Sequence, residues 1–194
     1  MADYGQYFDH LNSISQLGFF YKRYCVARVL YQYAMHFGNH FAEIGCGTGN
    51  GILGAHPKQV VGFEINPLAV SYCKDKHFNV RLIEEKANYP AQDGEFAACI
   101  LDNVLEHIAD PTFVLQECKR ITHDNGGLII AVPGDKGYAC DPDHKKHYKE
   151  AELAQLSQDW QLLKMFSLPF LVKSECLSKY VSQYCLVAVY KKSL

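Results

Sequence analysis

A short apolar segment that runs straight into a cluster of glycines, Phe41 to Gly51 (FAEIGCGTGNG), limits the possible folds more than any other part of this 194-residue chain. Glycine has no Cβ and tolerates positive φ angles, so this cluster predicts a backbone that turns sharply and passes close to a ligand. The glycines are Gly45, Gly47, Gly49 and Gly51. The segment therefore predicts a strand, a tight turn and a helix, with the ligand at the N-terminus of the helix.

The spacing of these glycines excludes two common phosphate-binding loops. A dinucleotide-binding turn requires G-x-G-x-x-G, but Asn50 stands at the third glycine position counted from Gly45. A nucleoside triphosphate loop requires a lysine, and no lysine lies between Phe41 and Pro57. The carboxylate of Glu43 precedes the turn, where it would repel a phosphate and attract a cation.

The pattern Glu-x-Gly-x-Gly-x-Gly, which begins at Glu43, resembles the glycine-rich first motif of class I S-adenosylmethionine-dependent methyltransferases. Their cofactor carries an ammonium and a sulfonium group. The resemblance implies that S-adenosylmethionine is the cofactor here and that this motif binds it. The motif residues expected to do so are Glu43, Gly45, Cys46, Gly47 and Gly49. A glycine-rich turn without a ligand is the alternative that the pattern leaves open.

Acidic residues after the next two expected strands extend the resemblance. Val60 to Phe63 is a short apolar run that predicts the second parallel strand, and Glu64 closes it. An acidic residue at this distance from the glycine turn can accept both hydroxyls of an adenosine ribose, so Glu64 and Ile65 are expected to bind the cofactor. After the third expected strand, Val80 to Ile83, Glu85 matches a family residue that contacts the adenine amino group. A surface charge is the competing interpretation of Glu85.

The fourth expected strand, Phe96 to Leu101, is entirely apolar and is followed by DNVLEHIADP. Ligands of open α/β sheets bind outside the carboxyl ends of the strands. We therefore expect Asp102 and Asn103 to bind the cofactor, and Glu106 and His107 to lie in the same cleft.

Leu105, Glu106 and His107 resemble the Leu-Glu-His signature of the methyltransferase group often called type 11. The chain departs from that group at Ala97, where an aspartate usually follows the phenylalanine. Because that aspartate is chiefly structural in such folds, the departure weakens the resemblance little.

The loop GDKGYACDPDHKKHY, after the fifth expected strand (Leu128 to Val132), is rich in groups that can titrate. By its distance to the following helix, His144 matches a histidine that many relatives carry. If the acceptor is a hydroxyl, His107 and His144 are the candidate general bases. The alternative is that each histidine is hydrogen-bonded in place. No metal is expected, because Asp141, Asp143, His144 and His147 match no strong ligand spacing.

Trp160 to Leu168 and Gln183 to Tyr190 predict two final strands without a crossover helix, which implies an antiparallel strand at the edge of the sheet. The resemblance covers residues 38 to 191. It implies an α/β fold of the Rossmann-like three-layer type, with a seven-stranded, mostly parallel sheet in the order 3-2-1-4-5-7-6. Strand seven is antiparallel, and helices cover both faces.

One domain is expected for residues 1–194. Residues 39–194 would form the cofactor-binding core, preceded by an aromatic-rich helical segment at 1–38. The start of that segment is a candidate flap over the cleft, with Tyr4, Tyr7 or His10 facing the substrate. Core packing is the alternative role for these aromatic side chains.

The composition argues against several partners. A formal net charge of -2 with interspersed signs provides no electrostatic footprint for nucleic acid. No segment approaches 18 uninterrupted apolar residues, so a cytoplasmic protein without a membrane span is expected. The eight cysteines contain no C-x-x-C pair and predict free thiols. The sequence does not indicate an oligomeric state.

The function that these features predict is transfer of a methyl group from S-adenosylmethionine to a small-molecule or lipid-like acceptor. The alternative is a cofactor-binding subunit that regulates or scaffolds without turnover. No N/D-P-P-Y/F string follows the fourth strand, which argues against methylation of exocyclic base amines or glutamine. Pro133-Gly134-Asp135 does not supply the Asp-Asn pair of metal-dependent catechol enzymes.

Overall fold

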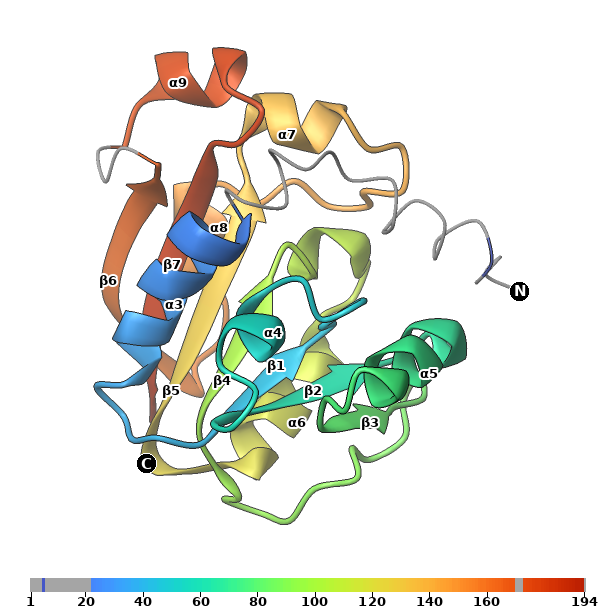
Figure 1. Cartoon of the computed structure of the whole chain (residues 1–194). Coiled ribbons are helices and arrows are strands. Elements are labelled where there is room, and N and C mark those ends of the chain that lie inside the picture. Colours follow the sequence, from blue (N-terminus) through green and yellow to red (C-terminus); the bar gives the residue numbers. More distant parts are fainter. Residues whose placement is uncertain (1–4, 6–21, 170–172, 194) are drawn as a thin grey trace.

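The computed structural model describes residues 5, 22–169 and 173–193, which contain one seven-stranded sheet (Figure 1). Its strands are β1 (Phe41–Ile44), β2 (Val60–Glu64), β3 (Val80–Leu82), β4 (Phe96–Asp102), β5 (Thr122–Pro133), β6 (Trp160–Leu168) and β7 (Cys185–Lys192). Their order is β3-β2-β1-β4-β5-β7-β6. The paired strands among β1 to β5 are parallel, whereas β7 is antiparallel to β5 and β6. The expected Rossmann-like order with a reversed seventh strand is confirmed.

Helices cover both faces of this sheet. The described residues form the helices η1 (Lys22–Val26), α3 (Ala27–Ala34), α4 (Ile52–Ala55), α5 (Pro67–Asp75), η2 (Leu105–His107), α6 (Thr112–Ile121), α7 (Asp135–Ala139), α8 (Glu150–Ala154) and α9 (Glu175–Tyr180). Figure 1 shows α3 and α4 in front of the sheet and α6 behind it. The described residues therefore form three layers.

Alternate side chains of the central strands enter two separate hydrophobic cores. In β4, Ala98 and Ile100 join the core that contains residues of α3 and α4, whereas Cys99 and Leu101 join the core that contains residues of α6. Successive strand residues point to opposite faces, so a strand covered by helices on both faces must be apolar throughout. This is why the sequence of β4 is an unbroken apolar run.

The helix that follows the titratable loop is short, since α8 covers only Glu150–Ala154. Glu152 accepts the backbone N–H of Lys149 at 2.8 Å, which satisfies a donor at the start of the helix. Beyond it, the N–H of Asp159 donates to the hydroxyl of Ser157 at 3.2 Å. Local bonds of this kind offer the backbone an alternative to helical pairing and end the helix early.

The fifth strand is longer than expected and begins at Thr122 instead of Leu128. Phe96 pairs with Thr122, but Ala98 pairs with Gly127, so the intervening residues of β5 bulge out of the ladder. Asn125 has a φ of 63° at this point. Asn125, Gly126 and Gly127 therefore belong to a bulge within one strand and not to a turn between two elements.

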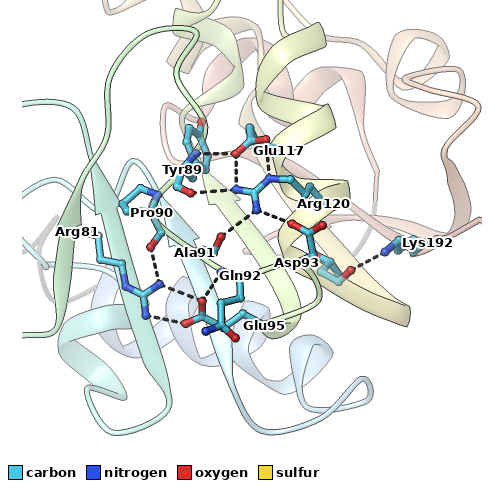
Figure 2. Close-up of polar contacts among 11 residues, drawn as sticks. Arg81, Tyr89, Pro90, Ala91, Gln92, Asp93, Glu95, Glu117, Arg120 and Lys192 are labelled. Carbon is cyan, nitrogen blue, oxygen red and sulfur yellow. Dashed lines mark hydrogen bonds and ion pairs between the residues drawn. The ribbon is translucent and has the colours of Figure 1, made fainter.

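Two arginines fasten the connection between β3 and β4 to the rest of the fold (Figure 2). Arg120 of α6 donates to both carboxylate oxygens of Glu117 at 2.9 and 2.7 Å. It also donates to the carbonyls of Tyr89 and Ala91, at 2.9 and 2.8 Å. Arg81 of β3 forms a two-pronged pair with Glu95, at 2.6 and 3.1 Å. These contacts fix the position of the β3–β4 connection, which leads into β4.

Three further expectations concern the flap, the division of the chain at residue 38 and a membrane span. Tyr4, Tyr7 and His10, the candidate flap side chains, lie outside the described residues. The division of the chain at residue 38 stays a prediction. Among the helices that the structure describes, none has the length and apolar character needed to span a bilayer.

Candidate functional site

The glycine turn connects β1 to α4 at the carboxyl edge of the sheet. Gly45, Gly47 and Gly49 have φ angles of 69°, 54° and 73°, a region that glycine enters without strain. A Cβ added at Gly45 would come within 2.6 Å of a methyl group of Val104, and one at Gly49 within 2.9 Å of the ring of Phe78. The turn therefore needs glycine both for its backbone and for its packing.

The turn lies where the strand order reverses, since β1 pairs with β2 on one side and β4 on the other. Pairing of Ile44 with Leu101 brings the beginning of the turn beside Asp102, which follows Leu101 at the end of β4. This reversal is the position at which open α/β sheets bind their ligands.

The side chain of Glu43 connects the end of β1 to the start of α4. It is 3% exposed, and its two carboxylate oxygens accept the backbone N–H groups of Ile52 at 3.2 Å and Leu53 at 2.6 Å. A carboxylate at this place satisfies N–H groups that begin a helix and have no partner within it. These contacts indicate a positioning role for Glu43, and direct contact with the cofactor stays a prediction.

Glu64 joins the end of β2 to the glycine turn. Its carboxylate accepts the N–H of Gly47 at 2.7 Å and the N–H groups of Ile65 at 3.0 Å and Asn66 at 2.9 Å. Burial raises the pKa of Glu64, and the three backbone N–H groups oppose that rise. The expected proximity of an acidic residue to the glycine turn is therefore present.

Asp102 and Asn103 lie together at the end of β4. The side-chain amide of Asn103 donates to Asp102 at 2.9 Å, and the backbone N–H of Asn103 donates to the carbonyl of Ala131 at 2.9 Å. Asn103 has a φ of 53°, so the chain turns sharply there. Both residues are placed at the same edge as the glycine turn.

The other cofactor candidates differ in their surroundings. Cys46 is buried, and a Cβ added at Gly62 of β2 would lie 2.5 Å from its sulfur, so its side chain faces the protein interior. Ile65 is half-buried beside Glu64. Glu85 is exposed in the turn after β3. Contact of Glu85 with an adenine ring stays a prediction.

His107 and His144 come together although they are distant in the sequence. Their ring centroids are 4.6 Å apart and their planes are inclined at 61°. His107 lies in η2, and His144 lies in the loop between α7 and α8. Burial and the proximity of His144 lower the pKa of His107, while Asp141 opposes the change.

Glu106 also belongs to this cluster; the sequence placed it in the cleft but assigned it no catalytic or binding role. Glu106 is 1% exposed, and its Oε1 lies 3.8 Å from Nε2 of His144. The sequence signal was the Leu-Glu-His segment itself, but it did not show which residue the glutamate would face. The partner comes from a loop almost forty residues further along the chain.

Comparisons with known proteins agree with this geometry. Residues 42–130 match a family model described as "Methyltransferase domain". A probable S-adenosylmethionine-dependent methyltransferase of Mycobacterium tuberculosis H37Rv is 24% identical over 126 residues, which are 60% of this chain and 46% of that protein. A similar protein of Mycolicibacterium smegmatis is 24% identical over 139 residues, covering 66% of this chain and 54% of its own length. The chain thus spans about half the length of these relatives.

Solved structures share the fold at low sequence identity. A methyltransferase of Thermotoga maritima, described as a possible histamine N-methyltransferase, has a TM-score of 0.73 at 17% identity, with all of both chains covered. A complex of the Trm112 methyltransferase activator with a methyltransferase of Haloferax volcanii has a TM-score of 0.74 at 12% identity, covering 99% of this chain and 98% of that one. At these identities the likeness establishes the fold alone.

The sheet order, the glycine turn and the solved structures define a class I methyltransferase fold. The family match and the relatives support a class I S-adenosylmethionine-dependent methyltransferase and imply S-adenosylmethionine as the cofactor. The resemblance expected from the glycine motif is thereby confirmed. The residues present fit that cofactor, because a tight glycine turn and a buried carboxylate meet at the switch point.

Proposed function

We propose that this chain transfers the methyl group of S-adenosylmethionine to a small-molecule or lipid-like acceptor. The observation that carries the proposal is the contact between the N–H of Gly47 and the carboxylate of Glu64, 2.7 Å apart at the switch point of the sheet. It holds an acceptor for ribose hydroxyls beside a backbone that a ligand can approach closely.

Each candidate residue has a part in this proposal. Glu64 and Ile65 hold the ribose, the glycine turn lies along the amino acid portion, and Glu85 reaches the adenine. Asp102 and Asn103 close the site from β4, and Glu43 keeps the turn in shape through its bonds to α4. Cys46 contributes through its backbone, since its side chain faces inward.

Bound S-adenosylmethionine would supply an electrophilic methyl group, so the protein needs no nucleophile of its own. Its task is to align the acceptor with that group, and alignment alone can lower a barrier by roughly 7 to 11 kcal/mol. His107 and His144 are the catalytic candidates. They lie beyond Asp102 on the segments after β4 and β5, where we place the acceptor.

The cellular compartment and the class of acceptor that we propose are inferred from the free cysteines and the net charge. All eight cysteines are free, which favours a reducing compartment such as the cytoplasm. The net charge of -2 favours an acceptor other than nucleic acid.

Thermal unfolding of the purified chain with S-adenosylmethionine, S-adenosylhomocysteine and NAD in turn tests the cofactor part of this proposal. We expect both adenosyl ligands to raise the midpoint and NAD to leave it unchanged. A ligand at 100 times its dissociation constant adds about 2.7 kcal/mol to the free energy of unfolding, which corresponds to several degrees. Absence of a shift with either adenosyl ligand at saturation would contradict the proposal. Binding without methyl transfer to any acceptor offered would favour the non-catalytic alternative.

Affinity for S-adenosylhomocysteine should fall with decreasing pH, starting at a higher pH than the ordinary titration range of glutamate. Burial raises the pKa of Glu64, so its carboxylate takes up a proton earlier than an exposed one and then accepts hydroxyl groups less well. Calorimetric titration from neutral to acidic pH measures this change. Glu64→Gln, which cannot titrate, should bind with intermediate affinity and show no such pH dependence. An identical pH profile in the variant would exclude Glu64 as the titrating group.

A further inference from the structure

We propose that Glu106, His107 and His144 bind a divalent transition-metal ion. Each of these residues offers one ligand atom, and the three atoms all lie within 4.8 Å of one another. Two imidazoles and one carboxylate form a donor set suited to Zn²⁺, Fe²⁺ or Co²⁺, whereas Mg²⁺ and Ca²⁺ prefer oxygen donors alone.

The two segments that supply these ligands are held together by backbone hydrogen bonds. The N–H groups of Lys145 and Lys146 both donate to the carbonyl of Glu106, at 2.8 and 3.1 Å. The loop that carries His144 is thereby fastened to η2, which carries the other two residues. The backbone positions of the cluster are set without the ion.

The orientation of His144 matches that of a metal ligand. Its Nδ1 lies 2.8 Å from the carbonyl oxygen of Tyr138, and the ring stacks on that of Tyr138 with centroids 5.1 Å apart. A carbonyl can only accept, so Nδ1 carries the proton and Nε2 keeps its lone pair. That lone pair faces the cluster. Metal-binding histidines commonly donate their other ring N–H to a carbonyl in this way.

The ring of His107 packs against that of His144, with centroids 4.6 Å apart and planes inclined at 61°. The side chain of His144 is 8% exposed and that of Glu106 is 1% exposed, so little solvent separates the donors.

The distances allow an ion to be shared after small adjustments. Metal bonds to histidine and carboxylate are about 2.0–2.2 Å long, so two atoms that share an ion lie up to about 4 Å apart. The 3.8 Å separation of Glu106 Oε1 from His144 Nε2 meets this limit. The widest pair, at 4.8 Å or less, must close in by rotation of a side chain. Asp141, whose Oδ2 is 3.9 Å from His144 Nε2, is available as a further ligand.

Three protein ligands leave coordination positions open, as in catalytic metal sites, where water or a substrate oxygen binds. The cluster follows Val104, whose side chain packs against Gly45, so it lies next to the glycine turn. An ion there would bind an oxygen of the acceptor and hold it for methylation. This use of the ion rests on the proposed function, whereas the binding of the ion does not.

The experiment is titration of the chelator-treated 194-residue chain with Co²⁺, followed by absorption, and with Zn²⁺, followed by calorimetry, both without any adenosyl ligand. We expect one ion per chain. His144→Ala and His107→Ala should each weaken binding by more than about 100-fold, beyond the 10- to 100-fold loss typical of an outer-shell partner. Glu106→Gln should weaken it too, with folding checked by circular dichroism.

His147→Ala is the matched control. His147 lies in the same loop and stacks on the same Tyr138 ring, with centroids 4.6 Å apart, but its Nε2 faces Asp135 at 3.4 Å. This variant should bind the ion as the wild type does.

Three outcomes would overturn the proposal. They are the absence of saturable binding in the wild type, equal loss in His147→Ala and His144→Ala, and a thiolate-to-cobalt absorption band that would place the ion on cysteine. S-adenosylhomocysteine binding is measured on the same samples. If the wild type binds that ligand but no ion, the metal site is rejected and the proposed function is unaffected.

Discussion

Glu64→Lys should abolish binding of S-adenosylmethionine and S-adenosylhomocysteine. The wild-type carboxylate lies between the glycine turn and the end of β2, where it accepts hydrogen bonds from three backbone N–H groups. Lysine cannot accept hydrogen bonds, and it places a positive charge beside a cationic cofactor. Hydrogen bonds to charged groups contribute about 1.5–3 kcal/mol each, so the loss of the two proposed ribose contacts should weaken binding by a factor on the order of 100 or more.

Calorimetry with S-adenosylhomocysteine measures this loss, and a matched variant separates binding from folding. Lysine also leaves the N–H groups of Gly47, Ile65 and Asn66 without the carboxylate, so the fold itself should be less stable. Glu64→Gln keeps the shape and one acceptor oxygen. We expect it to fold and to bind with intermediate affinity. A folded Glu64→Lys protein that binds within a few-fold of the wild type would remove Glu64 from the proposed site.

Arg120→Ala should lower the free energy of unfolding by about 3 kcal/mol, the lower end of the range for breaking a buried ion pair. The side chain of Glu117 is 7% exposed, and removal of Arg120 leaves this carboxylate with the N–H of Tyr89 but without its cation. The carbonyls of Tyr89 and Ala91 lose their donor as well. Urea unfolding at neutral pH measures the change.

Arg81→Ala is the matched control, because it removes the other arginine shown in Figure 2. The side chains of Arg81 and Glu95 are 27% and 21% exposed, so solvent screens this pair more. Its loss should cost about 1 kcal/mol, as for exposed pairs. Equal losses of stability in the two variants would contradict the larger contribution that we expect from Arg120.

The dependence of the free energy of unfolding on acidic pH offers a second test of the Arg120–Glu117 pair. Its guanidinium lowers the pKa of Glu117 below the ordinary value. The pair therefore contributes stability above the pKa of the unfolded state, and this contribution is lost as the pH falls through the lower, folded pKa. Arg120→Ala should lack that part of the acid dependence.

Much of the fold was predictable because its signals are local. The apolar run of β4 predicted a buried strand, and the strand is buried on both faces. The start of α5 also has a local cause, because Asn66 accepts the N–H of Leu68 at 2.9 Å and Pro67 stands in the first turn. The boundaries of α8 and β5 were less predictable. They depend on the Ser157 turn and on the bulge beside Ala98, which compete with the regular pattern.

The cofactor part of the candidate site also followed from local properties. Positive φ angles at Gly45, Gly47 and Gly49 are a requirement that glycine itself meets, and the distance to Glu64 follows from one strand–helix–strand unit. What the sequence could not show is the direction of each carboxylate. Glu43 faces α4, whereas Glu64 faces the turn.

The sequence by itself determined the parallel core of the sheet and the glycine turn, because hydrophobic periodicity and backbone freedom belong to individual segments. The tertiary structure alone decided that His144 meets Glu106 and His107. That meeting depends on two backbone bonds from Lys145 and Lys146 to Glu106, which form only after the α7–α8 loop packs against η2. No pattern within either segment specifies a contact between residues so far apart in the chain.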